Sequence, residues 1–137
     1  MMHADEIARP LRVLVVEDEM MVAMLIEDML DELGCSVVGP CAHIDEALKA
    51  ARELEFDAAL LDFNLNGKNT YPVAWTLRER NIPFLFATGY GSSILNSNFM
   101  GIPLLQKPFQ RRDLEWALQR AVQQSKSDSL GNGASAP

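Results

Sequence analysis

The chain has 137 residues, of which 48% are hydrophobic and 23% are charged. A chain of this length has the size of one domain and buries about two-thirds of its surface on folding. Its composition excludes a wholly disordered, a collagen-like or a disulfide-stapled protein. The formal net charge of −7 disfavours binding to nucleic acid, so we expect no nucleic-acid partner.

The sequence also predicts a protein that does not enter a membrane. The longest apolar run covers residues 20–26, far short of the ~20 residues that span a bilayer. The first residues lack the basic and apolar regions of a signal peptide, so we expect a cytoplasmic location. In that compartment Cys35 and Cys41 are expected to be reduced, mostly buried thiols.

Short apolar runs alternate along the chain with longer amphipathic stretches. In chain order, these predict a strand at 11–16, a helix at 21–33, a strand at 35–39, a helix at 45–54, a strand at 58–61, a helix at 70–80, strands at 82–87 and 102–105, and a helix at 111–123. In the helix at 21–33, the apolar residues are spaced for a wide buried stripe, which consists of Val22, Leu25, Ile26, Met29, Leu30 and Leu33. The stretch 89–101 should hold the fourth helix of this alternation. Because it is rich in Ser, Asn and Gly, we expect that helix to be short or irregular.

The predicted strands are continuous apolar runs, which is typical of parallel strands buried on both faces. Such βα units favour an α/β fold with a doubly wound, five-stranded parallel sheet of flavodoxin-like order 2-1-3-4-5. We expect residues 10–124 to form this domain and residues 1–9 to be a flexible N-terminus. Residues 125–137 have too few apolar side chains to offset their ordering, which predicts a disordered tail.

Polar or charged side chains follow four of the five predicted strands. Glu17 and Asp18 follow the first, Asp62 the third, Thr88 the fourth and Lys107 the fifth. Each has a plainer interpretation alone, since an Asp after a strand often caps a helix and a lone Thr or Lys is usually a surface residue. In a sheet of this order, however, the carboxyl ends of the strands share one crevice. The combination predicts that these side chains meet there.

Carboxylates gathered in one crevice raise one another's pKa values and destabilise the fold. A divalent cation relieves this repulsion, and Mg²⁺ takes oxygen ligands while keeping several waters. With the ammonium group of Lys107 and the hydroxyl group of Thr88 beside it, a carboxylate can attack phosphorus and form an acyl phosphate. We therefore expect Mg²⁺ as the cofactor of a phosphoryl-transfer site.

In this combination and order, residues 10–124 resemble the receiver domain of bacterial two-component response regulators. The resemblance implies that Asp62 accepts a phosphoryl group from the phosphohistidine of a histidine kinase. It implies that Thr88 and Lys107 contact that phosphoryl group. It also implies a cis peptide bond between Lys107 and Pro108.

The same resemblance implies a metal site. Asp18, Asp62 and the backbone carbonyl group of Asn64 would hold Mg²⁺, with Glu17 acting through a water molecule. One residue departs from the family pattern, because Asn66 stands where a proline is often found four residues after the acceptor.

Residues 86–91, Phe-Ala-Thr-Gly-Tyr-Gly, resemble a narrower subclass of small, often stand-alone receivers linked to HWE-type histidine kinases. The position of the usual switch aromatic, three residues before the lysine, is Leu104 here. We therefore expect a switch that involves Thr88 and Gly89, with Tyr90 partly replacing the aromatic side chain.

The function predicted from the sequence is that of a single-domain response regulator of a phosphorelay, and not of an enzyme in the usual sense. It would signal by contact with a protein partner that the sequence does not identify, or act as a phosphate sink. Two alternatives remain open. One is a phosphatase of the haloacid-dehalogenase type, which disagrees with Asn64 at the position of its second acid. The other is a degenerate receiver that binds partners without phosphorylation.

Overall fold

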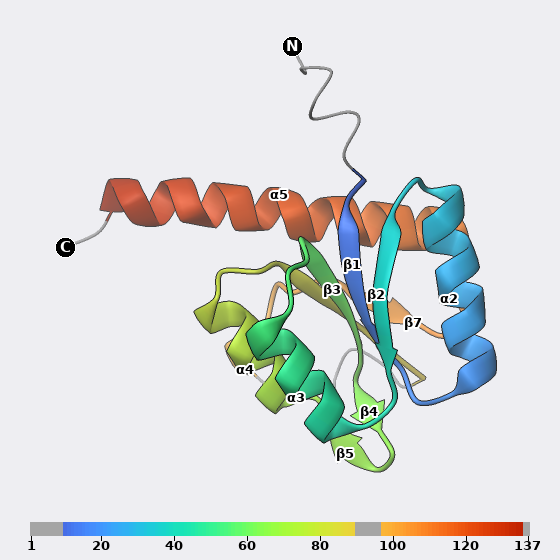
Figure 1. The fold of residues 1–137 in the computed structure, drawn as a ribbon. Helices are drawn as coiled ribbons and strands as arrows, with labels where there is room; N and C mark the ends of the chain where they lie inside the picture. Colours follow the sequence, from blue (N-terminus) through green and yellow to red (C-terminus); the bar gives the residue numbers. More distant parts are fainter. Residues whose placement is uncertain (1–9, 90–96, 136–137) are drawn as a thin grey trace.

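A computed structural model describes residues 10–89 and 97–135. Its centre is a five-stranded sheet with the order β2-β1-β3-β6-β7, and every strand pair in it is parallel (Figure 1). The strands are β1 (Arg12–Val16), β2 (Ser36–Cys41), β3 (Ala58–Asp62), β6 (Phe84–Thr88) and β7 (Leu104–Gln106). Counted along the chain within this sheet, the order is 2-1-3-4-5, which confirms the predicted fold class.

Helices cover both faces of the sheet (Figure 1). They are α2 (Met20–Glu32), α3 (Ile44–Glu53), α4 (Tyr71–Glu79) and α5 (Arg111–Ser135). Alternate residues of β1 point to opposite faces: Val13 and Val15 pack with α2 and α5, whereas Leu14 and Val16 pack with α3 and α4. Every residue of β3 and β6 is buried. This two-sided burial explains why the strands are continuous apolar runs in the sequence.

The end of β2 follows an unusual backbone path. Gly39 has a φ angle of 93°, and a Cβ atom there would lie 3.0 Å from the amide nitrogen of Cys41 and from the carbonyl oxygen of Val15. Only glycine fits this close approach without strain. The peptide bond between Gly39 and Pro40 is cis, and β2 continues to Cys41 instead of ending at residue 39.

A small hairpin follows the end of β3. Its strands, β4 (Asn64–Leu65) and β5 (Lys68–Asn69), pair in antiparallel fashion. The two turn residues, Asn66 and Gly67, have φ angles of 54° and 83°. An Asn-Gly pair is a frequent two-residue hairpin turn because both positions need positive φ. This hairpin is not among the elements predicted from the sequence, although an Asn-Gly pair is a signal for one.

In the described residues of the connection between β6 and β7, the side chain of Phe99 packs into the core. Phe99 ends a 3-10 turn, η2 (Ser97–Phe99), and is fully buried against four aromatic rings. These rings belong to Tyr71, Trp75, Phe84 and Phe86. In its described part this connection agrees with the predicted short or irregular fourth helix. Residues 90–96 lie outside the described residues.

Two helices differ from the sequence predictions. Leu25 was expected in the buried stripe of α2, but its side chain is 56% exposed. The last helix was expected to end at Gln123, with a disordered tail over 125–137, whereas α5 continues to Ser135. Extending an existing helix needs no new nucleation, so the low apolar content of residues 124–135 does not by itself end it. The domain boundary at residue 124 remains a prediction.

Cys41 is buried and Cys35 is half-buried, and both are free thiols. Burial raises the pKa of both thiols, that of Cys41 to about 11 with a further contribution from the charge of Glu46. Such thiols are poor nucleophiles, as expected of core cysteines. In the described part of the chain, no helix has the length and apolar character needed to cross a membrane.

Candidate phosphoacceptor site

The predicted site residues lie at the carboxyl ends of β1, β3, β6 and β7. Asp62 is the last residue of β3 and pairs with Ala87 of β6, one residue before Thr88. Glu17 and Asp18 directly follow β1. The backbone N–H group of Lys107 donates to the carbonyl oxygen of Thr88 at 2.7 Å, which fixes the end of β7 beside the end of β6.

Glu17 is almost completely buried and held at both carboxylate oxygens. Its Oε1 atom accepts a hydrogen bond from Nζ of Lys107 at 2.9 Å, and its Oε2 atom accepts one from the backbone N–H group of Glu19 at 3.0 Å. Its own backbone N–H group donates to the carbonyl oxygen of Cys41 at 2.9 Å. Glu17 therefore fixes Lys107 within the site.

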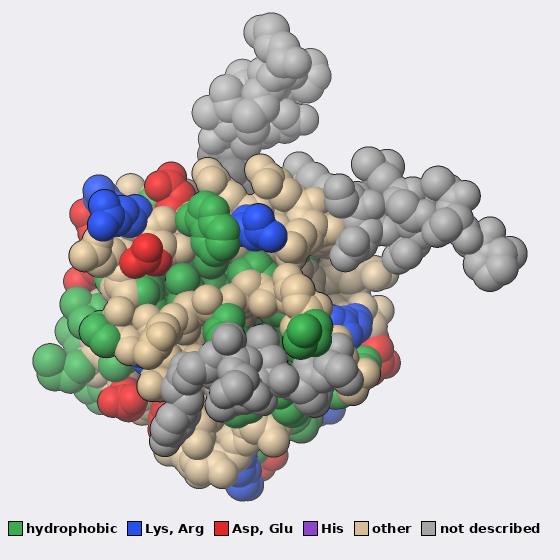
Figure 2. Space-filling model, turned by 180° about the vertical axis from the view of Figure 1, so that it is seen from behind, with side chains coloured by type: hydrophobic (Ala, Val, Ile, Leu, Met, Phe, Trp, Pro, Cys, Tyr) green, Lys and Arg blue, Asp and Glu red, His purple; other side chains and the backbone are tan. Residues whose placement is uncertain are grey.

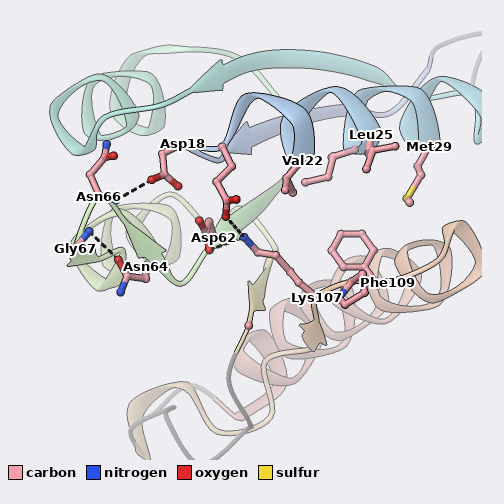
Figure 3. A pocket seen from close by; sticks show the side chains of 14 residues that line it. Asp18, Val22, Leu25, Met29, Asp62, Asn64, Asn66, Gly67, Lys107 and Phe109 are labelled. Carbon is pink, nitrogen blue, oxygen red and sulfur yellow. Dashed lines mark hydrogen bonds and ion pairs between the residues drawn. The ribbon is translucent and has the colours of Figure 1, made fainter.

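Asp62 is 4% exposed, and its Oδ1 atom lies 3.2 Å from Nζ of Lys107. The fully buried hydroxyl group of Thr70 donates to the backbone carbonyl oxygen of Asp62 at 2.8 Å. The hydrogen bond from Thr70 thus fixes the main chain of Asp62, while the carboxylate of Asp62 faces the cavity (Figure 3). In the sequence, Thr70 stands only as the first residue of a predicted helix, and its hydrogen bond to Asp62 depends on the backbone path between β3 and α4.

The charges in this site do not balance. Burial, and then the negative charge of Glu17, raise the pKa of Asp62 to about 7, although Lys107 opposes this shift. Burial alone would lower the pKa of Lys107, but its hydrogen bond to Glu17 and the nearby charge of Asp62 leave that pKa above its ordinary value. Lys107 therefore keeps its positive charge, whereas burial opposes ionisation of the carboxyl group of Asp62.

Glu17, Asp18 and Asp62 each offer a carboxylate oxygen, and these atoms lie within 4.8 Å of one another. Oxygen is the ligand that Mg²⁺ prefers in proteins. Lys107 contributes a single positive charge to these three carboxylates, through its contacts with Glu17 and Asp62. The donor set and its excess charge both fit a divalent cation.

Asp18 and Asp62 line a cavity of about 710 Å³. Its other wall is apolar and comes from α2 and from the start of the β7–α5 connection (Figure 3). The apolar residues are Val22, Leu25, Ile26, Met29, Pro108 and Phe109. The peptide bond between Lys107 and Pro108 is cis. The sequence did not predict this wall, because the helical stripe of α2 was interpreted as core.

The other residues predicted for the site or its switch do not all lie at the cavity. Asn64 and Gly89 line the cavity, and Thr88 is buried at the end of β6. Leu104 is half-buried and packs on the other face, against the cluster formed with α3 and α4. Tyr90 lies outside the described residues, so its predicted part in a switch stays a prediction.

Comparison with known proteins explains why these residues occur together. Residues 13–119 match the family described as "Response regulator receiver domain". The chain belongs to this family. The site described above therefore lies where the parallel sheet of a receiver domain gathers its strand ends.

The chain is similar to a solved structure and to two curated proteins. The solution structure of SdrG from Sphingomonas melonis Fr1 is 39% identical, with a TM-score of 0.75, and the match covers 82% of this chain and 97% of that one. PdtaR of Mycobacterium tuberculosis, a transcriptional regulatory protein, is 29% identical over 119 residues, 84% of this chain and 58% of PdtaR. LytT of Bacillus subtilis, a sensory transduction protein, is 28% identical over 117 residues, 80% of this chain and 47% of LytT. The chain thus spans about half the length of these curated relatives.

Proposed function

We propose that this receiver domain is the phosphoacceptor of a two-component phosphorelay and that Asp62 is the residue phosphorylated. One observation carries the proposal. The carboxylate of Asp62 faces a cavity, 3.2 Å from a lysine ammonium group and within 4.8 Å of two further carboxylates. A nucleophilic carboxylate, a fixed cation and a place for a metal ion are the parts that phosphoryl transfer to an acid requires.

In the proposed reaction, an oxygen of Asp62 attacks the phosphorus atom of a phosphohistidine. The new O–P bond forms as the N–P bond breaks, and the electron pair of that bond returns to the imidazole nitrogen. Lys107 would offset the charge on the phosphoryl oxygens, and the hydroxyl group of Thr88 would donate a hydrogen bond to one of them. Asp18, Asp62 and the backbone carbonyl group of Asn64, with Glu17 acting through water, would hold Mg²⁺, which supplies further charge neutralisation.

The surroundings of Asp62 favour a protein as the phosphoryl donor. Apolar side chains of α2 lie on the surface next to the cavity; Met20 and Met21 are each 76% exposed, and Met24 and Leu25 are 58% and 56% exposed. Figure 2 shows exposed hydrophobic side chains gathered at the edge of the molecule that α2 forms. A group of this kind on one helix is typical of a protein-binding surface.

We propose a histidine kinase as that donor, and one of the HWE type because of the Phe-Ala-Thr-Gly segment at 86–89. The phosphorylated domain would act by protein contact or as a phosphate sink, without a conventional enzymatic activity. The match to nearly the whole length of SdrG supports a role as a single domain.

The proposal is tested by incubating the protein with Mg²⁺ and acetyl phosphate, followed by intact mass spectrometry. The expected result is a stable gain of one phosphoryl group per chain, which is absent when EDTA replaces Mg²⁺. Rapid release of phosphate without an adduct would instead indicate a phosphatase. No adduct and no release would indicate a receiver that works without phosphorylation, and either result would overturn the proposal.

A further inference from the structure

The tip of the β4–β5 hairpin contacts the predicted metal site. The backbone N–H group of Asn66 donates to Oδ2 of Asp18 at 3.2 Å (Figure 3). The side-chain amide of Asn66 donates from Nδ2 to the carbonyl oxygen of Ala42 at 2.8 Å, and Nδ2 lies 3.4 Å from Nδ1 of His43. A single residue therefore joins three loops: the hairpin turn, the segment after β1 and the segment after β2.

The hairpin holds its tip in one conformation. Asn66 has a φ angle of 54°, a region that Asn adopts more readily than most residues. The N–H group of the next residue, Gly67, donates to the side-chain oxygen of Asn64 at 2.8 Å. The Asn66 N–H group that faces Asp18 thus belongs to a turn that two hydrogen bonds fix. One is made within the hairpin, by the side chain of Asn64, and the other joins the hairpin to Ala42.

The contact also opposes an electrostatic force. Glu17 and Asp62 lie within 4.8 Å of Asp18, and their repulsion favours rotation of its carboxylate away from the site when no cation is bound. A hydrogen bond from a fixed backbone N–H group to one oxygen resists that rotation, because the bond is lost if the carboxylate turns away. In this orientation a carboxylate oxygen of Asp18 lies within 4.8 Å of oxygens of Glu17 and Asp62.

We propose that Asn66 is a positioning residue for the cation. Its side-chain amide anchors the hairpin tip to Ala42, and the anchored N–H group keeps the carboxylate of Asp18 oriented for Mg²⁺. This inference rests on the proposed phosphoacceptor function, because it assigns Mg²⁺ to the acidic cluster. It adds a residue outside the acidic cluster that determines how tightly that cluster binds.

The experiment compares the parent with Asn66→Gly. Glycine keeps the positive φ angle but removes the amide that bonds to Ala42. Isothermal titration calorimetry with MgCl₂ should give a dissociation constant about tenfold higher for the variant, the low end of the loss expected when a residue that orients a metal ligand is removed. Melting curves in EDTA record whether the fold itself has changed.

Asn81→Gly is the matched control. Asn81 also has a positive φ angle, 59°, but lies before β6, at the end of the sheet opposite the site. The Asn81→Gly variant should bind Mg²⁺ with the same dissociation constant as the parent. Equal affinities for Asn66→Gly and the parent, or an equal loss in both variants, would overturn the role of Asn66 and leave the proposed function standing. A parent that shows neither binding heat nor thermal stabilisation with Mg²⁺ would overturn both.

Discussion

At the scale of single residues, Asp62 combines a reactive position with a cost to stability. Its pKa is raised from 3.8 to about 7, first by burial and then by Glu17. The folded protein therefore holds this proton more tightly than the unfolded chain does. As pH rises from about 4 to about 7, the proton is lost and the folded state becomes less stable relative to the unfolded one. Above pH 7 the full cost is present.

Replacing Asp62 by Asn should remove that cost. In EDTA at pH 8 we expect Asp62→Asn to unfold about 3–8 °C above the parent, corresponding to about 1–2 kcal/mol for a domain of this size. The difference should shrink as the pH falls toward 4, and melting curves across this range measure it. Asp28→Asn, which changes an exposed acid on α2, is the control and should shift the melting temperature little. Equal melting temperatures of Asp62→Asn and the parent at pH 8 would contradict this account.

The proximity of the predicted site residues could be read from the sequence, but the contacts that support them could not. Glu17, Asp18, Asp62 and Lys107 were predicted to lie together because each stands within two residues of the end of a predicted strand, and parallel strands bring such positions to one edge of the sheet. Asn66 appeared in the sequence only as a departure from the family pattern. Its contact with Asp18 depends on the backbone path of a hairpin whose strands are two residues long.

At the scale of elements, α4 holds the end of the β6–β7 connection. Nη1 of Arg78 donates to the carbonyl oxygen of Asn98 at 2.7 Å. Its guanidinium group also lies 4.7 Å from the ring centre of Phe99 and 5.5 Å from that of Trp75. These contacts attach the residues just before β7 to the face of the sheet that α3 and α4 cover.

Loss of these contacts should weaken the domain measurably. We expect Arg78→Ala to lower the free energy of unfolding by about 1–2 kcal/mol, since a hydrogen bond and a cation–π contact are lost together. Arg111→Ala is the comparison, because the ion pair of Arg111 with Glu32 is more than half exposed and should contribute about 0–1 kcal/mol. Urea unfolding measures both variants. If Arg78→Ala were no more destabilising than Arg111→Ala, the attachment through α4 would be refuted.

The sequence predicted the strands of the sheet more accurately than the ends and the buried faces of the helices. Continuous apolar runs located the strands of the sheet, because burial on both faces leaves a strong pattern. The end of α5 was predicted wrongly because a Ser- and Gly-rich composition says little about a helix that has already begun. Leu25 was misplaced because helical spacing alone does not tell which edge of a wide apolar stripe meets the sheet.

At the scale of the whole molecule, the acidic cavity and the apolar surface of α2 adjoin each other. Val22, Leu25 and Met29 belong to both the helix and the cavity wall, so a protein that binds α2 reaches the carboxylate of Asp62. A small phosphoryl donor reaches Asp62 without contacting the exposed methionines. The two kinds of donor should therefore respond differently to changes on α2.

We expect Met24→Glu to slow phosphoryl transfer from an HWE-type kinase that phosphorylates the parent by about tenfold. A charge placed in an apolar contact surface must lose water when the partner binds. Phosphorylation of the same variant by acetyl phosphate should be unchanged. Met100→Glu, at another exposed methionine, should match the parent with both donors. Transfer from the kinase at the parental rate to Met24→Glu would exclude α2 from the binding surface.

The central claim, that Asp62 is the residue phosphorylated, is tested most directly by locating the phosphoryl group on the chain. The protein is treated with acetyl phosphate and Mg²⁺, reduced with sodium borohydride, and digested for peptide mass spectrometry. Because borohydride reduces an aspartyl phosphate to homoserine, the account predicts homoserine at position 62 and intact aspartate at position 18. Homoserine at another position, with Asp62 intact, would contradict it.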